Sequence, residues 1–526
     1  MTEILRKLFV PAAIAMAAFA SSGATPEGDA ELAVRNVNRA MALIDASWSK
    51  TMKGSRNNLY MADRYNTATG EVSGPSDIWP LTAAVEAHCS LLEALEAVKE
   101  TDPEIYSDNF EKYADQLNVL IDNLEYYRGT YRLSSYATSN KESKPYAVPR
   151  SGSRGGANVT GILNVYDDQM WLARELVRAY RILDNEEYLE LATYLTDYVL
   201  DGWDCWHDDN GEEYGGITWG PGYNSKHACS NAPIIQPLVW LSDIYKDSGE
   251  SLEFATRNES DKVVKLTLDR SQHYLDFARK VYDWQVKKLM NSQSGVYYDM
   301  MGADGKIIVS RGYRQHVDCG GAVGSYYPYN TGTMIAGAAE LYRVTGEERF
   351  RTELSKSAKG ALNQFAAYKR AYNCYDFKTD DTAENGFLTW FNDVLMRSYV
   401  DAAPYCDNSS ASNGLNGFQT TLDYAFENHN RDDMLPIHLL NGWGTETVTK
   451  PFHQFAFASE YAMLAVYNMN LIAKAGVAEV NADIASPLSD MVYNLAGVAL
   501  GHLSDVEHRL PRGLYIVGGK KLTLGK

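Results

Sequence analysis

Apolar residues recur at three- and four-residue spacing along most of the chain, and this spacing constrains the fold more than any other feature. Pro103 stands at the first position of one such segment, and Gly346 directly follows another. The pattern predicts an all-α protein with twelve helices. The expected segments are 30–49, 77–99, 103–127, 165–182, 186–203, 229–247, 262–290, 329–345, 347–367, 385–401, 415–429 and 453–475.

Short turns join some of these helices in pairs. The stretches 180–187 and 342–348 share one arrangement, in which a helix ends, a tight turn follows and a second helix begins. This is the αα-hairpin. Twelve helices in repeated hairpins predict six hairpins closed into a ring, an (α/α)6 barrel, with a superhelical stack of the same hairpins as the alternative.

The other connectors are long and rich in Gly, Ser, Asn and Tyr. Loops of this length inside a compact domain are usually functional. Because they mostly alternate with short connectors, we expect the long loops on one face of the barrel, with a ligand cleft among them. The predicted long loops are 128–164, 204–228, 291–328, 372–384 and 402–414.

The two ends of the chain differ from the helical middle. Arg6 and Lys7 precede an apolar stretch that ends in Ala18-Phe19-Ala20, which predicts a signal peptide over residues 1–24. We therefore expect export to the periplasm, the extracellular space or the cell surface. No later apolar run of about 20 residues predicts a membrane span. Residues 25–480 form the expected catalytic domain. Residues 481–526 are expected to be a C-terminal extension with two short strands around a Gly-Gly turn.

Net charge, aromatic content and cysteine spacing indicate which ligands the protein can bind. A net charge of -19 argues against nucleic acid, whose phosphates need clustered Lys and Arg, and it favours a neutral substrate. The 36 Tyr and 10 Trp supply rings of the kind that stack on sugars. The six Cys form no CxxC motif or Cys/His cluster, so we expect no metal and no cofactor. Pairing of Cys205 with Cys229 and buried free thiols both remain open.

Asp167 and Asp168, here called the Asp pair, are the strongest candidates for chemistry. They lie between Val165-Tyr166 and Met170-Trp171-Leu172, whereas the other three Asp-Asp dipeptides lie among polar residues. Two carboxylates in an apolar surround are costly unless they are paired or used. The alternative is stabilisation of a helix N-terminus by acidic residues. Adjacent carboxyl groups at a helix start can stand roughly 5–6 Å apart, which favours a retaining glycosidase.

Three segments resemble glycoside hydrolase family 76, the α-1,6-mannanases. They are Tyr166-Asp167-Asp168-Gln169-Met170-Trp171; Gly215-Gly216-Ile217-Thr218-Trp219, followed by Lys226 and Ser230-Asn231-Ala232; and Tyr329-Asn330-Thr331-Gly332. The resemblance extends over residues 35–475 and implies an (α/α)6 barrel without a catalytic metal. It also implies that Asp167 is the nucleophile and Asp168 the general acid/base. The chain departs from the family pattern at Thr389 and His227, which affects the expected subsites and linkage.

Substrate contacts are expected from side chains and glycines in these segments. Aromatic residues could stack on sugars, amides could bind hydroxyls, and glycines could let the backbone approach a ligand. Core packing, helix capping and ordinary turns are the respective alternatives. The candidates are Tyr166, Gln169, Trp171, Gly215, Gly216, Trp219, Lys226, Asn231, Tyr329 and Asn330.

The sequence therefore predicts a monomeric, retaining, endo-acting α-1,6-mannanase that acts on α-mannan or mannooligosaccharides. Other six-hairpin glycosidases remain open as alternatives. A glycan lyase with a His or Tyr base is another, and a non-catalytic glycan-binding protein is a third.

Overall fold

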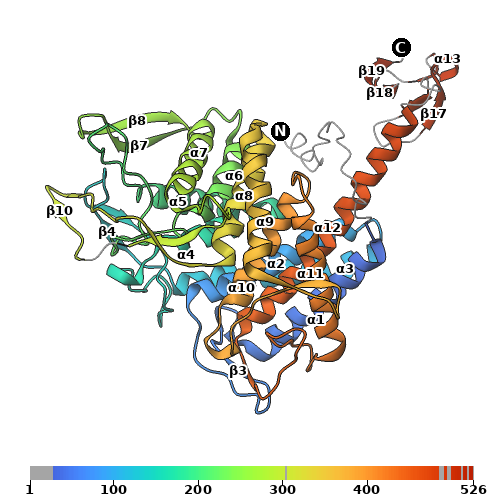
Figure 1. Ribbon diagram of the computed structural model, residues 1–526, viewed down its shortest axis with the longest axis horizontal. Helices are drawn as coiled ribbons and strands as arrows, with labels where there is room; N and C mark the ends of the chain where they lie inside the picture. The colour runs from blue at the N-terminus through green and yellow to red at the C-terminus, as the bar shows by residue number, and fades with distance from the viewer. Residues whose placement is uncertain are drawn as a thin grey trace.

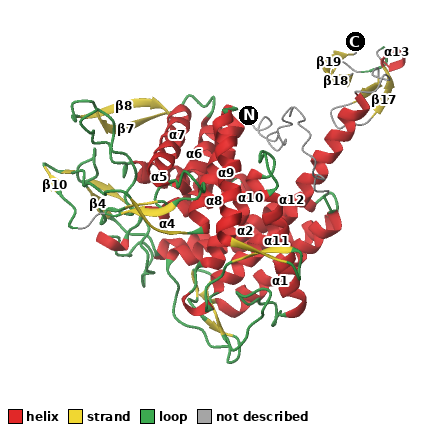
Figure 2. Ribbon diagram, viewed as in Figure 1, coloured by secondary structure: helices red, strands yellow, loops and turns green. Residues whose placement is uncertain are grey.

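The computed structural model describes residues 28–302, 305–484, 491–493, 499–506, 508–510, 513–517 and 520–524. The expected signal peptide, residues 1–24, lies outside these residues. The described chain is predominantly helical, and each of the twelve predicted segments contains an α-helix. Figure 1 and Figure 2 show these helices gathered in one body, with small strand pairs at its edges.

Six helices contact one another in a cyclic order along the chain: α2 with α4, then α6, α8, α10, α12 and back to α2. We call them the inner helices. Most of their residues are buried, as a helix surrounded by other helices requires. Their bounds are α2 (Ile78–Val98), α4 (Tyr166–Leu183), α6 (Ile235–Tyr245), α8 (Pro328–Thr345), α10 (Leu388–Ala402) and α12 (Pro451–Ile484).

The other six long helices each pack against at least one inner helix. They are α1 (Ala30–Thr51), α3 (Pro103–Asn123), α5 (Glu186–Leu200), α7 (Arg270–Leu289), α9 (Glu348–Phe365) and α11 (Ser410–Asn428). Most are amphipathic, with one buried face and one solvated face. We call them the outer helices.

The first two turns of five inner helices meet at one end of the body. The ring of Trp79, in α2, lies 5.5 Å from Trp390 of α10 and 5.1 Å from Phe452 of α12. Trp171 of α4 in turn lies 5.1 Å from Trp390 and 6.4 Å from Tyr329 of α8. The inner helices therefore direct their N-terminal ends, with their unpaired N–H groups, toward a common region.

Long connectors enter every inner helix. They cover residues 52–77, 124–165, 201–234, 290–327, 366–387 and 429–450. The predicted long loop at 402–414 is wrong, because α11 already begins at Ser410. The long connectors before α2 and α12, residues 52–77 and 429–450, were not predicted.

Short strands within the connectors depart from the all-α prediction. The predicted helix 262–290 begins late, because Val263–Asp269 alternates and pairs with Ser251–Arg257. The strands are β1 (Met52–Ser55), β2 (Asn58–Met61), β3 (Tyr65–Asn66), β4 (Tyr131–Leu133), β5 (Lys141–Ser143), β6 (Lys226–His227), β7 (Ser251–Arg257), β8 (Val263–Asp269), β9 (Tyr298–Met301), β10 (Val309–Ser310), β11 (Tyr313–Arg314), β12 (Ala322–Tyr326), β13 (Ala366–Lys369), β14 (Cys374–Phe377) and β15 (Val448–Thr449). Four 3-10 turns complete them: η1 (Leu124–Tyr126), η2 (Gly161–Leu163), η3 (Ala232–Ile234) and η4 (Ala383–Asn385).

The C-terminal part of α12 projects from the body and leads to a small sheet (Figure 1). This sheet has the strand order β17-β16-β18-β19. Its strands are β16 (Met491–Tyr493), β17 (Ala499–His502), β18 (Gly513–Val517) and β19 (Lys520–Leu524), with the short α13 (Leu503–Val506) beside them. No helix in the described part of the chain is long and apolar enough to cross a membrane. All six Cys are free thiols.

A buried ionic network joins three inner helices. Arg178 of α4 pairs with Glu175 at 2.8 Å, and Arg174 contacts Glu175 and Glu86 of α2. Arg397 of α10 pairs with Glu86, and these two side chains are 4% and 1% exposed. A buried charge that loses its partner is strongly destabilising. These pairs therefore hold α2, α4 and α10 together, beneath the region where the inner helices begin.

Replacing Arg397 with Met should lower the free energy of unfolding by roughly 3–5 kcal/mol, because Glu86 would keep its burial and lose its closest cation. Chemical denaturation measures this loss. The matched control is Arg132→Met, which removes an exposed pair with Glu142 and should cost less than about 1 kcal/mol. Equal losses in the two variants would contradict a structural role for the network.

Candidate active site

The Asp pair occupies the first turn of α4, at the end of the body where the inner helices begin. Val165 precedes the helix in an extended conformation, and the backbone N–H of Tyr166 donates to the carbonyl of Trp219 at 2.8 Å. This bond joins the start of α4 to the connector that enters α6. The sequence therefore places both carboxylates where the positive end of a helix dipole faces them.

Hydrogen-bond donors surround Asp167. The indole Nε1–H of Trp219 donates to Oδ2 at 3.1 Å, and the backbone N–H of Asp168 donates to Oδ1 at 3.1 Å. The Cys229 thiol also interacts with this carboxylate. Burial raises the pKa of Asp167, and these donors oppose the rise because they stabilise the charged form.

Asp168 has the opposite surroundings. Its side chain is 3% exposed, and Oδ2 is buried without a hydrogen-bond partner. Burial, followed by the negative charge of Asp167 and then that of Asp77, raises the pKa of Asp168 well above its usual range. Adjacent carboxyl groups that share one region cannot both ionise easily. The difference in donors assigns the charge to Asp167 and the proton to Asp168.

Asp77 is a third carboxylate near the pair that the sequence reading missed. It occupies the N-cap position of α2, yet its side chain makes no capping hydrogen bond. Burial and the charge of Asp63 raise its pKa, while Lys450 opposes this rise. An Asp directly before an apolar helical run reads as an ordinary cap, so the sequence offered no signal for another role.

Aromatic rings lie beside the carboxylates. Trp219 stacks on His227 with ring centroids 4.6 Å apart, and Tyr223 lies 4.6 Å away on a tilt. Tyr329 stacks on Phe391 at 4.1 Å, and Phe387 is 41% exposed although it is large and apolar. Aromatic rings are suited to stack on the C–H faces of sugars. Of these six residues, only Trp219 and Tyr329 were predicted as substrate contacts.

Two buried amides hold the connectors at the site. Asn231 donates to the carbonyls of Ile217 and His227 at 2.9 and 2.7 Å and accepts from the N–H of Ile217 at 2.7 Å. Gln169 exchanges two hydrogen bonds with the backbone of Tyr146, each at 2.9 Å. Both side chains are fully buried. Their observed role is to fix loop conformation, and sugar contact by either remains a prediction.

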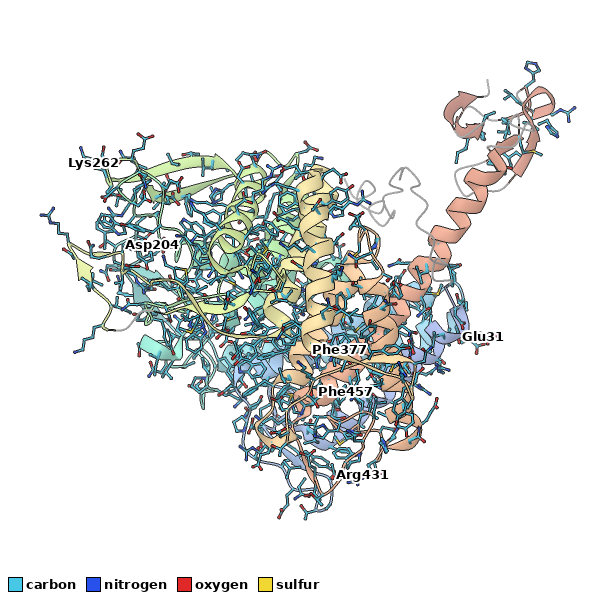
Figure 3. All side chains as sticks on the ribbon, viewed as in Figure 1. Glu31, Asp204, Lys262, Phe377, Arg431 and Phe457 are labelled. Carbon is cyan, nitrogen blue, oxygen red and sulfur yellow. The ribbon has the colours of Figure 1, made fainter. Side chains whose placement is uncertain are left out.

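Lys226 lies in a buried ion pair. Its Nζ is 2.8 Å from Asp204 Oδ2 and donates to the carbonyl of Gly215 at 2.5 Å. His316 Nδ1 is 2.7 Å from the same Asp204 oxygen. Figure 3 shows Asp204 within the loop-rich part of the molecule. This polar cluster supports the loop that carries Gly215, Gly216 and Trp219.

Gly215 and Gly216 meet a packing requirement. Their φ angles are +70° and +79°, a region that favours glycine. A Cβ atom would stand 2.6 Å from Trp284 at Gly215 and 2.3 Å from Trp284 at Gly216. The two glycines therefore let this loop lie flat on the Trp284 ring, and close approach to a ligand remains a prediction.

The remaining predicted contacts are buried. Tyr166, which is 1% exposed, packs against Tyr198, and Trp171, which is 4% exposed, meets Trp390 edge to face. Asn330 is fully buried and donates to Asp299 Oδ1 at 3.2 Å. These side chains form the walls behind the site. Among the described residues, no group of three or more His, Cys, Asp or Glu is arranged to hold a metal ion.

The fold also resembles solved structures of one enzyme class. The mannosidase Bt3792 from Bacteroides thetaiotaomicron superposes with a TM-score of 0.58 at 18% identity, covering 82% of this chain and 98% of that chain. An α-1,6-mannanase from Salegentibacter sp. gives a TM-score of 0.55 at 17% identity, covering 82% and 99%. At these identities the likeness shows the fold, which is that of helical glycoside hydrolases.

The family itself follows from a match over most of the chain. The model of Glycosyl hydrolase family 76 matches residues 44–258 and 263–480, and the chain belongs to this family. It is similar to the mannan endo-1,6-alpha-mannosidase DFG5 of Saccharomyces cerevisiae, with 26% identity over 206 residues, 38% of this chain and 37% of that protein. The yeast mannan endo-1,6-alpha-mannosidase DCW1 is 23% identical over 288 residues, 49% and 56%. The chain thus spans between about a third and about a half of these curated relatives.

Replacing Asp168 with Asn should stabilise the protein at neutral pH, because the amide needs no proton to be buried; each unit by which the pKa of Asp168 is raised is worth about 1.4 kcal/mol. A raised pKa means that the folded state keeps a proton that the unfolded state releases above pH about 4. The free energy of unfolding of the wild type should therefore fall as the pH rises above about 4, whereas the amide side chain of the variant does not titrate.

The gain should shrink toward zero below pH about 4, where the unfolded carboxyl is also protonated. Thermal unfolding across pH measures both effects. Asp167→Asn is the matched control, and it should gain less because Trp219 and a backbone N–H already stabilise that carboxylate. A larger gain for Asp167→Asn would contradict the assignment of charge and proton.

Proposed function

We propose that the chain is a retaining, endo-acting α-1,6-mannanase that cleaves the backbone of α-mannan or mannooligosaccharides. The observation that carries this proposal is the unequal surroundings of the Asp pair, with donors on Asp167 and none on Oδ2 of Asp168. A nucleophile and an acid of different pKa are what double displacement needs.

The comparisons support the same substrate class. Both curated relatives carry the name mannan endo-1,6-alpha-mannosidase. An inactive variant of the Salegentibacter mannanase, with two adjacent Asp residues replaced by Asn, is described in complex with α-1,6-mannotriose. The net charge of -19 also favours a neutral glycan over an acidic one.

The proposed reaction proceeds in two steps. Asp167 attacks the anomeric carbon while Asp168 transfers its proton to the departing glycosidic oxygen, which leaves as the free end of the glycan. Asp168, now ionised, takes a proton from water, and the resulting hydroxyl displaces Asp167 and frees the second sugar. Trp219 and the N-terminal end of α4 hold the charge on Asp167 before and after the covalent intermediate.

We further propose that the cyclic contacts of the inner helices form an (α/α)6 barrel, with residues 25–480 as the catalytic domain and 481–526 as an extension. Its open end carries the long connectors and the Asp pair. A signal peptide over residues 1–24, export and a monomeric state complete the proposal. These remain predictions from the sequence.

A lyase would need a different base. Burial raises the pKa of Tyr329 well above its ordinary value, so this phenol stays protonated at neutral pH. Burial lowers the pKa of His227 to about 4, which makes its imidazole a weak base, and its Nε2 lies 3.0 Å from the Ser225 hydroxyl. The carboxylate pair is therefore the better supported centre.

Incubation with unbranched α-1,6-mannan should release oligosaccharides whose first-formed reducing ends keep the α configuration, as NMR and mass analysis would show. Asp167→Asn and Asp168→Asn should each lower kcat/KM by about 10³-fold or more. Asp209→Asn, in an exposed Asp-Asp dipeptide, is the matched control and should retain activity. Unsaturated ends that absorb ultraviolet light would indicate a lyase, and inverted products would contradict double displacement.

Replacing Trp219 with Phe keeps an aromatic ring and removes the donor to Asp167. The pKa of Asp167 should rise, so the acidic limb of the kcat/KM profile should move to higher pH, with roughly tenfold lower activity at neutral pH. Trp443→Phe is the matched control, since it removes an indole hydrogen bond to the carbonyl of His429 instead. An unmoved acidic limb in Trp219→Phe would contradict the role given to this donor.

A further inference from the structure

A cavity lies between inner and outer helices, on a different face of α10 from the Asp pair. Its volume is about 180 Å³, and α10, α11, α12, the β13–β14 hairpin and residues 437–441 all contribute to its wall. Trp390 of α10 faces Trp171 and Trp79, whereas Thr389 and Asn392, which are three residues apart and share one face, line the cavity.

Three side chains in this wall have buried polar atoms without partners. They are Thr389 Oγ1, Asn392 Oδ1 and Glu460 Oε2, from residues that are 3%, 4% and 2% exposed. Native proteins rarely leave such atoms unsatisfied, because each costs free energy. The Asn392 oxygen accepts a hydrogen bond, and the Thr389 hydroxyl can donate or accept. Burial raises the pKa of Glu460 well above its ordinary value, so its carboxyl keeps a proton and can donate as well. The occupant that fits must therefore both donate and accept hydrogen bonds, as hydroxyl groups do.

The rest of the wall is apolar and partly aromatic. Phe377 of β14 stacks on Phe418 of α11 at 4.2 Å, and Phe457 of α12 also lines the cavity. Figure 3 labels Phe377 and Phe457, which both line this cavity. Rings beside unpaired polar atoms suit a molecule with hydroxyl groups on its edge and C–H bonds on its face.

Size and charge narrow the occupant further. A volume of 180 Å³ is below the usual range for drug-sized ligands, about 300–1,000 Å³, so the cavity fits one small ring. The cations in the wall are already engaged: Lys369 lies 3.5 Å from Asp376, and Lys378 donates to the carbonyl of Gln364 at 2.8 Å. A neutral molecule therefore fits better than an anion.

We propose that this cavity is a second binding site, separate from the Asp pair, that takes one neutral monosaccharide. Thr389, Asn392 and Glu460 bind its hydroxyl groups, and Phe377 and Phe457 cover its apolar face. The site involves no bond cleavage, so the proposal does not depend on the hydrolytic function.

Methyl NMR of Ile437, whose side chain lines the cavity, reports occupancy directly. Titration with D-mannose should give a saturable shift of this resonance, assigned through Ile437→Val, in the wild type. Thr389→Val keeps the side-chain shape and removes the hydroxyl, so the affinity should fall about fivefold. Ala367→Trp, at an exposed position in the cavity wall, should block the mouth and abolish the shift.

Tyr368→Trp is the matched control, because residue 368 points to the other face of β13 and is not in the cavity wall. It should bind as the wild type does. An Ile437 resonance that never moves with mannose or other neutral sugars would mean that the cavity holds water only, and would overturn the proposal. A shift that survives Ala367→Trp would place the binding elsewhere and overturn it equally.

Discussion

The carboxyl groups of Asp167 and Asp168 lie side by side in the first turn of α4, and most of the hydrogen-bond donors near them contact Asp167. Burial alone would raise the pKa of both. Trp219 and a backbone N–H favour the charge on Asp167. Burial, and after it the charge of Asp167, keeps the proton on Asp168. The different protonation states of Asp167 and Asp168 thus follow from the placement of a few donors. The surrounding loops and helices hold these donors in position.

Two sets of buried interactions hold these donors in place. Near the carboxylates, the connectors are pinned by Asn231, Gln169 and the buried Lys226–Asp204 pair, while Gly215 and Gly216 allow their loop to lie on Trp284. Deeper in the body, the Arg397–Glu86 pair and its neighbours join inner helices that begin at the same end. Displacement of the loop would remove Trp219 from Asp167, so loop packing and the proton distribution are coupled.

The helical fold could be read from the sequence because its signal is local. Apolar spacing located the twelve helices, and Pro103 begins its helix as predicted. Residues 263–269 were predicted as helix but form a strand. A short strand directly before a helix has too few residues to distinguish the two-residue period of a strand from the 3.6-residue period of a helix. The family resemblance is confirmed by the match over residues 44–258 and 263–480.

Less of the candidate site than of the fold could be predicted from the sequence. The motif around Asp167 could be recognised, but Asp77, Phe387 and Phe391 come from other connectors and helices, and no local pattern shows that they converge. Asn231 and Lys226 were predicted as substrate contacts, and the structure shows that both are buried and anchor loops. A side chain that anchors a loop and one that binds sugar use the same chemistry, so the sequence alone could not reveal the anchoring role.

The most direct test of the account is the infrared carbonyl band of protonated carboxyl groups, measured at neutral pH as the difference between wild type and each Asp variant. Loss of a protonated band in Asp168→Asn, and its retention in Asp167→Asn, is the predicted result. A band that is unchanged by Asp168→Asn, or lost only in Asp167→Asn, would contradict it.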